Sequence, residues 1–306
     1  MSQPLPFTGE RFVPGHPNAQ GEMWYEHWHR YHFVLPWVSG ASVLDVACGE
    51  GYGSALLAGG ALRVTGLDVS AEAVAHARSA YRDRANLEFA EGSCTRMPFA
   101  DGQFDIAVSF ETLEHIGEQE AFADELKRVL KPDGLLVIST PNKAEYSDKR
   151  GFANEFHVKE LYREQFDGLL ASRFATRRWL SQRNAFVSII CEGEDGLRGD
   201  CRTVSQAAPD APAAALPPLY WIVLASNAPA DRWPLPARLS VFTDAEEWAY
   251  NDYRETYKGF QHYRRREQEL EAQVAALRAP AAASPAAAAP DAADSWLARL
   301  IKKLST

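Results

Sequence analysis

Two acidic side chains and a glycine-rich loop are the residues of this 306-residue chain best placed to bind a ligand. Asp45 stands four residues before Gly49, and residues 49–53 read GEGYG. The apolar residues 43–47 are typical of a buried parallel strand, and residues 54–58 of the helix that follows it. A carboxylate at the end of that strand would repel a pyrophosphate, but it suits a ligand that carries an ammonium and a sulfonium. The pattern therefore predicts S-adenosylmethionine rather than NAD.

The glycine spacing and a second acid favour the same ligand. A dinucleotide-binding loop has the pattern G-x-G-x-x-G, whereas Ser54 occupies the place of the third glycine here. Asp68 ends a second predicted strand, 63–68, where a carboxylate can accept both hydroxyl groups of a ribose. Each such charged hydrogen bond contributes about 1.5–3 kcal/mol. The alternative is a plain tight turn with Asp68 as a helix cap, but acids and glycines coincide at both strand ends, which favours a ligand site.

Strands and helices alternate through the first half of the chain. Apolar runs predict strands near residues 43–47, 64–68, 87–90, 104–110 and 134–140, with helices between them, including 71–81 and 119–130. Residues 174–180 and 220–226 are candidates for two more strands. Alternation of this kind predicts an α/β fold in which a mostly parallel sheet is covered by helices on both faces.

Four sequence blocks occur in an order that resembles the class I S-adenosylmethionine-dependent methyltransferases. They are VLDVACGEGYGSALLA, VTGLDVSAEAVAHAR, NLEFAEGSCTRMPFADGQFDIAVSFETLEHI and ELKRVLKPDGLLVISTPN, all between residues 42 and 142. The resemblance implies a Rossmann-like, doubly wound sheet of seven strands, closed by an antiparallel hairpin. It also implies these cofactor contacts: the methionine end at Asp45, Ala47, Gly49 and Gly51, the ribose at Asp68, the adenine at Val69, Gly92, Ser93 and Cys94, and the transferable methyl beside Phe110.

An aromatic segment precedes this region. Trp24, Trp28 and Tyr31 recur at helical spacing, so they either pack on the sheet as core or form a lid that keeps water from the cofactor. In the lid interpretation, Arg11 and Arg30 face anionic groups, and Arg11 and Tyr31 contact the cofactor. The motifs FTGERFVP and EHWHRY resemble methyltransferases of bacterial surface-polysaccharide biosynthesis, including that of O-antigen. This second resemblance implies a glycan or lipid-linked glycan acceptor.

Candidate catalytic groups follow the fourth and fifth predicted strands, where open α/β sheets place their ligands. They are Glu111, Glu114, His115 and His157. A sugar hydroxyl is a poor nucleophile until a base accepts its proton, and an imidazole suits this task near neutral pH. We therefore expect His157 to be the base, with His115 as the second choice and Glu111 as a third catalytic candidate. The alternatives are that His115 only orients its loop and that His157 caps a helix. A phosphate acceptor would need no base and would depend on Arg11, Arg30, Lys143 or Arg183.

Composition limits the partners and the compartment. The formal net charge of −9 and the pI near 5.4 argue against a nucleic-acid backbone as the main partner. The four cysteines have no C-x-x-C spacing, so we expect no metal site, and the N-terminus has no signal-peptide pattern. The expected location is the cytoplasm, with peripheral contact to the inner membrane face through the C-terminus.

The chain divides into five expected segments. We expect an N-terminal lid segment at 1–40 and a methyltransferase domain at 41–243 with an insertion near 191–218. A long helix or short coiled coil at 244–278, an Ala/Pro linker at 279–294 and an amphipathic tail helix at 295–306 follow. The coil would join copies of the chain into a homo-oligomer, or lie on its own domain. The tail, with Arg299, Lys302 and Lys303 opposite an apolar face, would contact a membrane surface or dock on a protein.

The sequence therefore predicts an S-adenosylmethionine-dependent O-methyltransferase that acts on a sugar hydroxyl or terminal phosphate of a surface glycan. Three alternatives stay open. The acceptor could instead be a quinone-like molecule or another secondary metabolite. The chain could be a cofactor-binding recruitment module without catalysis, although intact Asp45, Asp68 and glycine loop weigh against this. Methylation of RNA is disfavoured by the overall acidity.

Overall fold

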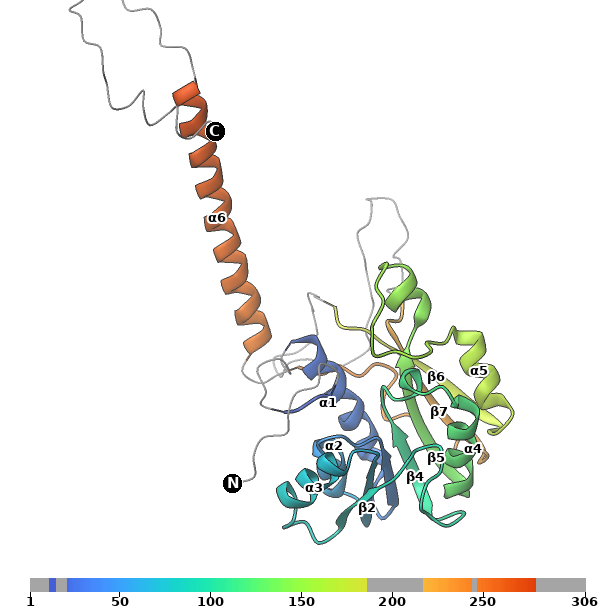
Figure 1. Cartoon of the computed structure of the whole chain (residues 1–306). Helices are drawn as coiled ribbons and strands as arrows, with labels where there is room; N and C mark the ends of the chain where they lie inside the picture. The colour runs from blue at the N-terminus through green and yellow to red at the C-terminus, as the bar shows by residue number, and fades with distance from the viewer. Residues whose placement is uncertain (1–10, 15–20, 186–216, 244–246, 279–306) are drawn as a thin grey trace, which may run out of the picture. The chain divides into compact units, whose positions relative to one another are not determined.

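The computed structural model describes residues 11–14, 21–185, 217–243 and 247–278 (Figure 1). The chain divides into two compact units, residues 1–243 and 244–306. The expected linker 279–294, the expected tail 295–306 and most of the expected insertion 191–218 lie outside the described residues. The first unit contains the sheet and everything that positions the site.

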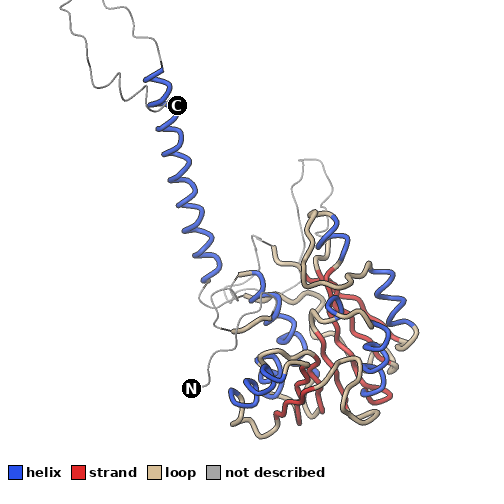
Figure 2. The backbone as a smooth tube through the Cα atoms, in the orientation of Figure 1, coloured by secondary structure: helices blue, strands red, loops and turns tan. Residues whose placement is uncertain are grey.

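A seven-stranded sheet forms the centre of the first unit, with strand order β3-β2-β1-β4-β5-β7-β6 (Figures 1 and 2). The first five strands are parallel, and β7 runs antiparallel to both β5 and β6. The predicted fold class is confirmed. The strands are β1 (Ser42–Val46), β2 (Arg63–Asp68), β3 (Leu87–Glu91), β4 (Phe104–Ser109), β5 (Leu130–Pro141), β6 (Thr176–Gln182) and β7 (Tyr220–Ser226).

Two strands begin more than one residue away from their predicted starts. β5 begins four residues before the expected position 134, because Leu130 already pairs with Phe104 across an irregularity in the β4 register. β6 begins two residues after the expected position 174, because Phe174 is buried in the core beside α5 instead of pairing with β7. Neither shift moves a strand end that faces the site.

Alternate residues of each strand enter two separate cores, one on each face of the sheet. On one face, Leu44 and Ala107 pack with α4 (Gln119–Val129) and α5 (Arg163–Ala171). On the other, Val43 and Ile106 pack with α1 (Glu22–Val34) and α2 (Tyr52–Ala58). α3 (Ala71–Ala80) packs on Cys48 and Phe89. The remaining short helical turns are η2 (Leu35–Trp37), η3 (Leu113–His115) and η4 (Ala144–Asp148).

The chain turns back at the middle of the sheet, where β1 lies between β2 and β4. Open parallel sheets bind ligands at the carboxyl ends of strands at such a reversal. Two non-glycine residues adopt left-handed backbone conformations just past these ends, Ala47 after β1 with φ 59° and Glu111 after β4 with φ 51°. Left-handed backbone costs of order 1 kcal/mol or more per residue and gathers at functional sites.

The aromatic stripe of α1 packs on the sheet, as one of its two interpretations expects. Tyr31 is buried, and Trp24 and Trp28 are partly buried against the same core. Tyr31 also makes edge contacts with the rings of Tyr52 and Phe110, with ring centroids 5.3 and 5.0 Å away. The helix therefore belongs to the core and at the same time brings Tyr31 to the carboxyl ends of β1 and β4.

The described part of the second unit is one helix, α6 (Trp248–Arg278). Its apolar side chains Tyr253, Phe260, Tyr263, Leu270 and Val274 are exposed, from 45% to 75%. The predicted helix at 244–278 is thus present, and self-association through it stays a prediction. Membrane contact through the tail also stays a prediction, and among the residues described here no helix is both long and apolar enough to span a bilayer.

Replacement of Gly53 by alanine should destabilise the first unit, because an added Cβ would stand 2.0 Å from the buried Tyr31 ring. We expect a loss of about 1–3 kcal/mol in the free energy of unfolding, the range typical of overpacking, measured by urea titration. Gly168→Ala in α5 is the matched control, since nothing lies within 4 Å of its added Cβ. That variant should gain up to about 1 kcal/mol from helix propensity. Equal stabilities for the two variants would refute the packing of α1 on α2.

Candidate active site

A cavity of about 380 Å³ opens at the carboxyl ends of β1, β2 and β4. This volume lies in the range of small-molecule sites. Most residues that the sequence singled out line it: Arg11, Tyr31, Ala47, Gly49, Asp68, Val69, Gly92, Cys94, Phe110, Glu111 and His115. Five of the predicted site residues are not among the lining residues: Asp45, Gly51, Ser93, Glu114 and His157.

The carboxylate of Asp68 connects the glycine loop to the turn after β2. Its Oδ2 accepts the backbone N–H of Gly49 at 2.8 Å, and its Oδ1 accepts that of Ser70 at 2.9 Å. A carboxylate has about four acceptor positions, so two remain after these bonds are made. Because Asp68 also lines the cavity, these positions can accept the two hydroxyl groups of a ribose.

The glycines let the loop backbone pass close to the ligand space. Gly51 has φ +91°, and a Cβ there would stand 2.8 Å from the Phe89 ring. Gly49 has φ +56° and lines the cavity with its backbone. Val69 is 74% exposed beside Asp68, which leaves an apolar side chain free to cover a flat base. Together with the two open acceptor positions of Asp68, these features fit an adenosine.

Asp45 lies behind the cavity wall and is fully buried. Its carboxylate accepts the Tyr31 hydroxyl at 3.0 Å and the Ser54 hydroxyl at 2.6 Å. Burial raises the pKa of Asp45 to about 7, the Asp68 carboxylate adds to the rise, and the two hydroxyl donors oppose it. The structure therefore gives Asp45 a positioning role, since it fixes the Tyr31 ring that lines the cavity.

Sequence reasoning missed seven lining residues. Phe12, His27 and Tyr52 form one side of the cavity, where His27 stacks on Phe12 at 4.9 Å and contacts the Tyr52 hydroxyl at 3.0 Å. Burial, and then Arg30, lower the pKa of His27 to about 3, so this imidazole stays neutral. All three residues lie in the motifs FTGERFVP, EHWHRY and GEGYG, and these motifs could have identified them as site residues from the sequence. The other four are Cys48, Leu67, Thr112 and Ile116.

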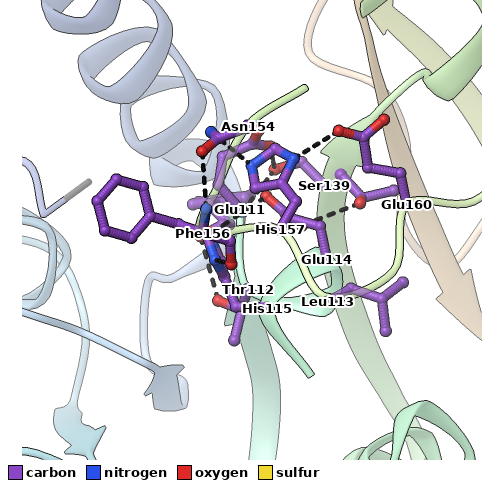
Figure 3. A network of polar contacts seen from close by, with 12 residues as sticks. Glu111, Thr112, Leu113, Glu114, His115, Ser139, Asn154, Phe156, His157 and Glu160 are labelled. Atoms are coloured by element: carbon purple, nitrogen blue, oxygen red, sulfur yellow. Dashed lines mark hydrogen bonds and ion pairs between the residues drawn. The ribbon is translucent and has the colours of Figure 1, made fainter. Parts of the chain in front are cut away.

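Glu111 lines the cavity, and two side chains hold its carboxylate, of which Ser139 is labelled beside it in Figure 3. The Ser139 hydroxyl donates to its Oε1 at 2.6 Å, and Arg30 Nη2 lies 3.4 Å from the same oxygen. Arg30 comes from α1, is almost fully buried, donates to Gln182 Oε1 at 2.7 Å and lies over the Tyr220 ring. A buried cation of this kind fixes the Glu111 carboxylate, because an unpaired charge would be costly there.

Glu114, His115 and His157 gather beside Glu111 in one polar network (Figure 3). His115 Nδ1 lies 3.0 Å from the Phe156 carbonyl, and His157 Nδ1 lies 2.6 Å from Glu160 Oε1. Burial, and then the Glu111 carboxylate, raise the pKa of Glu114 well above its ordinary value. Of the two histidines only His115 lines the cavity, whereas the His157 ring contacts it edge to face at 5.0 Å. The geometry thus places His115 in front of His157.

Residues 44–138 match the family model described as "Methyltransferase domain". A probable S-adenosylmethionine-dependent methyltransferase of Mycolicibacterium smegmatis is 38% identical over 168 residues, which are 54% of this chain and 63% of that protein. The 2-methyl-6-phytyl-1,4-hydroquinone methyltransferase of Synechocystis is 32% identical over 156 residues, 51% of this chain and 48% of that protein. The chain thus spans less than two thirds of the length of these curated relatives.

The fold is also similar to solved structures. The PH0226 protein of Pyrococcus horikoshii OT3 is 18% identical, with a TM-score of 0.49 over 68% of this chain and 92% of that one.

Replacement of Asp45 by asparagine should change how stability depends on pH. The pKa of Asp45 is raised in the folded state. Its contribution to the free energy of unfolding is therefore full below the pKa of about 4 in the unfolded chain, and it is lost as the pH rises to about 7. Asp45→Asn should therefore gain stability relative to the wild type across this window, by at most about 4 kcal/mol at 1.4 kcal/mol per pKa unit. Urea unfolding at several pH values measures the difference.

Asp105→Asn is the control for this experiment. Lys131 and the Ser42 N–H hold the pKa of Asp105 below its ordinary value against the effect of its burial. The contribution of Asp105 to the free energy of unfolding is lost as the pH falls, so its pH dependence has the opposite sign to that of Asp45. Parallel curves for the wild type and Asp45→Asn would refute the raised pKa of Asp45.

Proposed function

We propose that this chain, in which residues 44–138 form a class I S-adenosylmethionine-dependent methyltransferase domain, methylates an oxygen atom of its acceptor. S-adenosylmethionine is the cofactor of this domain, and when bound it supplies an electrophilic methyl group on a sulfonium. The observation that carries the proposal is Asp68, whose two open acceptor positions face a cavity beside the glycine loop. In the overall reaction the acceptor oxygen gains the methyl group and its proton is released.

The residues at the two ends of the cavity have different tasks. Asp68 and the loop at Gly49 would hold the adenosine, and Tyr31 and Phe110 would shield the reacting centre from water with their rings. His115 would orient the acceptor hydroxyl. Its Nδ1 is placed to donate to the Phe156 carbonyl, which in the neutral ring leaves Nε2 as a hydrogen-bond acceptor toward the cavity.

His157 would act through its neighbours in this proposal, because it does not line the cavity. Its ring lies between the Glu160 carboxylate and the Asn154 amide, and it supports the His115 ring by edge contact. Glu111, held by Arg30 and Ser139, would accept a hydrogen bond from a second acceptor hydroxyl. Orientation of this kind is the main requirement of an in-line displacement, in which the reacting atoms must approach to about 3–3.5 Å.

As the acceptor we propose a sugar hydroxyl or a terminal phosphate of a bacterial surface glycan. The resemblance of FTGERFVP and EHWHRY to surface-polysaccharide methyltransferases supports it. The polar groups at the acceptor end and the exposed rings of Phe152 and Phe156, 51% and 42% exposed, also suit a sugar, which has polar edges and an apolar face. The second candidate is a hydroquinone, which the name of the Synechocystis relative favours.

Asp68→Asn tests the cofactor site. Loss of charged hydrogen bonds to the ribose, about 1.5–3 kcal/mol each, should weaken S-adenosylmethionine binding at least tenfold in calorimetry. Asp105→Asn is the matched control, because Asp105 also accepts a backbone N–H, that of Ser42 at 2.9 Å, but does not line the cavity. It should bind the cofactor as the wild type does. Equal affinities for Asp68→Asn and the wild type would remove the ribose assignment.

The acceptor class is tested by transfer of a labelled methyl group. The enzyme should label fractionated bacterial glycans, and the label should survive in a methylated sugar or a methyl phosphate after hydrolysis. Labelling of a hydroquinone alone would select the second candidate. Cofactor binding at wild-type affinity without transfer to any fraction would instead identify a recruitment module.

A further inference from the structure

Three side chains at the acceptor end bring potential metal ligands together. One ligand atom each from Glu114, His115 and His157 lies within 4.8 Å of the other two. In a tetrahedral zinc site with bonds of about 2.0–2.1 Å, ligand atoms stand about 3.3 Å apart. Closure to that spacing needs side-chain shifts of about 1 Å, which are within the reach of rotamer adjustment. One ligand of the three, His115, lines the cavity.

The outer contacts of both histidines are those of metal ligands. His115 Nδ1 faces the Phe156 carbonyl at 3.0 Å, and His157 Nδ1 faces the Glu160 carboxylate at 2.6 Å. Histidines that bind metals typically donate one ring N–H to a carbonyl or carboxylate in this way, which orients the other nitrogen toward the ion. The Ser147 hydroxyl donates to Glu160 and holds this carboxylate in turn. Both Nε2 atoms therefore belong to one cluster.

The buried carboxylate of Glu114 points to a ligand independently of the two histidines. Its side chain is 1% exposed, Oε2 accepts the Thr140 hydroxyl at 2.9 Å, and Oε1 has no hydrogen-bond partner among the residues that the structure describes. The nearest cationic candidate for Oε1 is His115 Nε2 at 3.9 Å. A buried carboxylate oxygen without a partner carries a desolvation cost of about 1–3 kcal/mol or more. The neighbouring Glu111 has no such deficit, because Ser139 and Arg30 hold it.

We propose that Glu114 Oε1, His115 Nε2 and His157 Nε2 bind a divalent transition-metal ion at the acceptor end of the cavity. Two imidazoles and one carboxylate suit zinc and ferrous iron rather than magnesium or calcium. The Asn154 amide, 3.1 Å from His157 Nε2, must move away from that nitrogen when the ion enters. This site departs from the expectation of no metal, which rested on cysteine spacing alone.

The ion would keep an open position toward the cavity. Glu114 and His157 approach from the buried side, while His115 is 30% exposed on the cavity side. Three protein ligands with a fourth position open are typical of catalytic zinc. Resting on the proposed function, this position would take the acceptor oxygen, so that His115 would orient the acceptor through the ion in place of a direct hydrogen bond, and the bound hydroxyl would release its proton to water. Bound zinc lowers the pKa of water to about 7, so a hydroxyl ligand is activated by the same effect.

Metal binding by the purified full-length chain tests this proposal without turnover. After treatment with a chelator, the protein should bind about one Zn²⁺ per chain in calorimetry, and Co²⁺ should give the visible absorption of a low-coordinate nitrogen and oxygen site. Glu114→Gln, His115→Ala and His157→Ala should each weaken Zn²⁺ binding at least tenfold. Glu160→Gln should weaken it less, because it changes only the orientation of His157.

His76→Ala is the matched control. It removes another histidine paired with a glutamate, since His76 Nε2 lies 3.1 Å from Glu50 Oε1, and it should keep the wild-type affinity for Zn²⁺. Circular dichroism and S-adenosylmethionine binding verify that each variant is folded, so a failure of the metal site is distinguishable from a failure of the cofactor site. The proposal would be overturned if the wild type bound no Zn²⁺, or if all three ligand variants bound Zn²⁺ with the affinity of the wild type.

Azide tests the open position on the Co²⁺ form. A ligand exchange at this position should shift the visible spectrum of the wild-type protein. An unchanged spectrum at saturating azide would mean a closed coordination sphere, and it would overturn the assignment of the ion to the acceptor.

Discussion

The carboxylate of Asp68 is the interaction on which the cofactor half of the site depends. The backbone N–H groups of Gly49 and Ser70 both donate to this carboxylate, which therefore connects the turn after β1 to the turn after β2. The turn after β1 also has backbone bonds of its own, from Cys48 N–H to the Leu67 carbonyl and from Gly51 N–H to the Cys48 carbonyl, both at 3.0 Å, and the Asp68 carboxylate adds to them. The same oxygens are the ones available to a ribose. In the proposed site, one charge would therefore serve both the local fold and the recognition of the ribose.

A buried cation, Arg30, connects the parts of the fold around Glu111 and His115, the half of the cavity proposed for the acceptor. Arg30 connects α1 to β6 through Gln182, to β7 through Tyr220 and to the end of β4 through Glu111. Desolvation of such a group is expensive, and partners from three parts of the fold offset that cost. The position of Glu111 consequently depends on a helix that lies eighty residues earlier in the chain. The segment before β1 is thus part of the site as well as part of the core.

The sequence predicted the sheet, the cofactor and most of the cavity wall, since these depend on local patterns. Strand periodicity placed β1 to β5, and the glycine loop with Asp68 marked the ligand end. Contacts that depend on packing were out of reach. The bonds from the Tyr31 and Ser54 hydroxyls to the buried Asp45 carboxylate are contacts of this kind, and the cofactor contact of Asp45 stays a prediction. The edge contact of His157 with the cavity-lining His115 is another, which no spacing rule could reveal, and the role of His157 as a base also stays a prediction.

The acceptor end is assembled from distant segments, and this explains how its specificity can vary. The backbone N–H groups of Val158 and Lys159 both donate to the Glu114 carbonyl, at 2.8 and 2.9 Å, so residues 154–160 are fastened to η3 by the main chain. These main-chain bonds do not depend on which side chains the segment carries. The cofactor half has no such freedom, because Gly51 and Gly53 tolerate no Cβ without displacing a buried ring. One half of the cavity is thus fixed by the packing of rings around glycines and the other by main-chain bonds, so substitutions in the two halves should differ in cost.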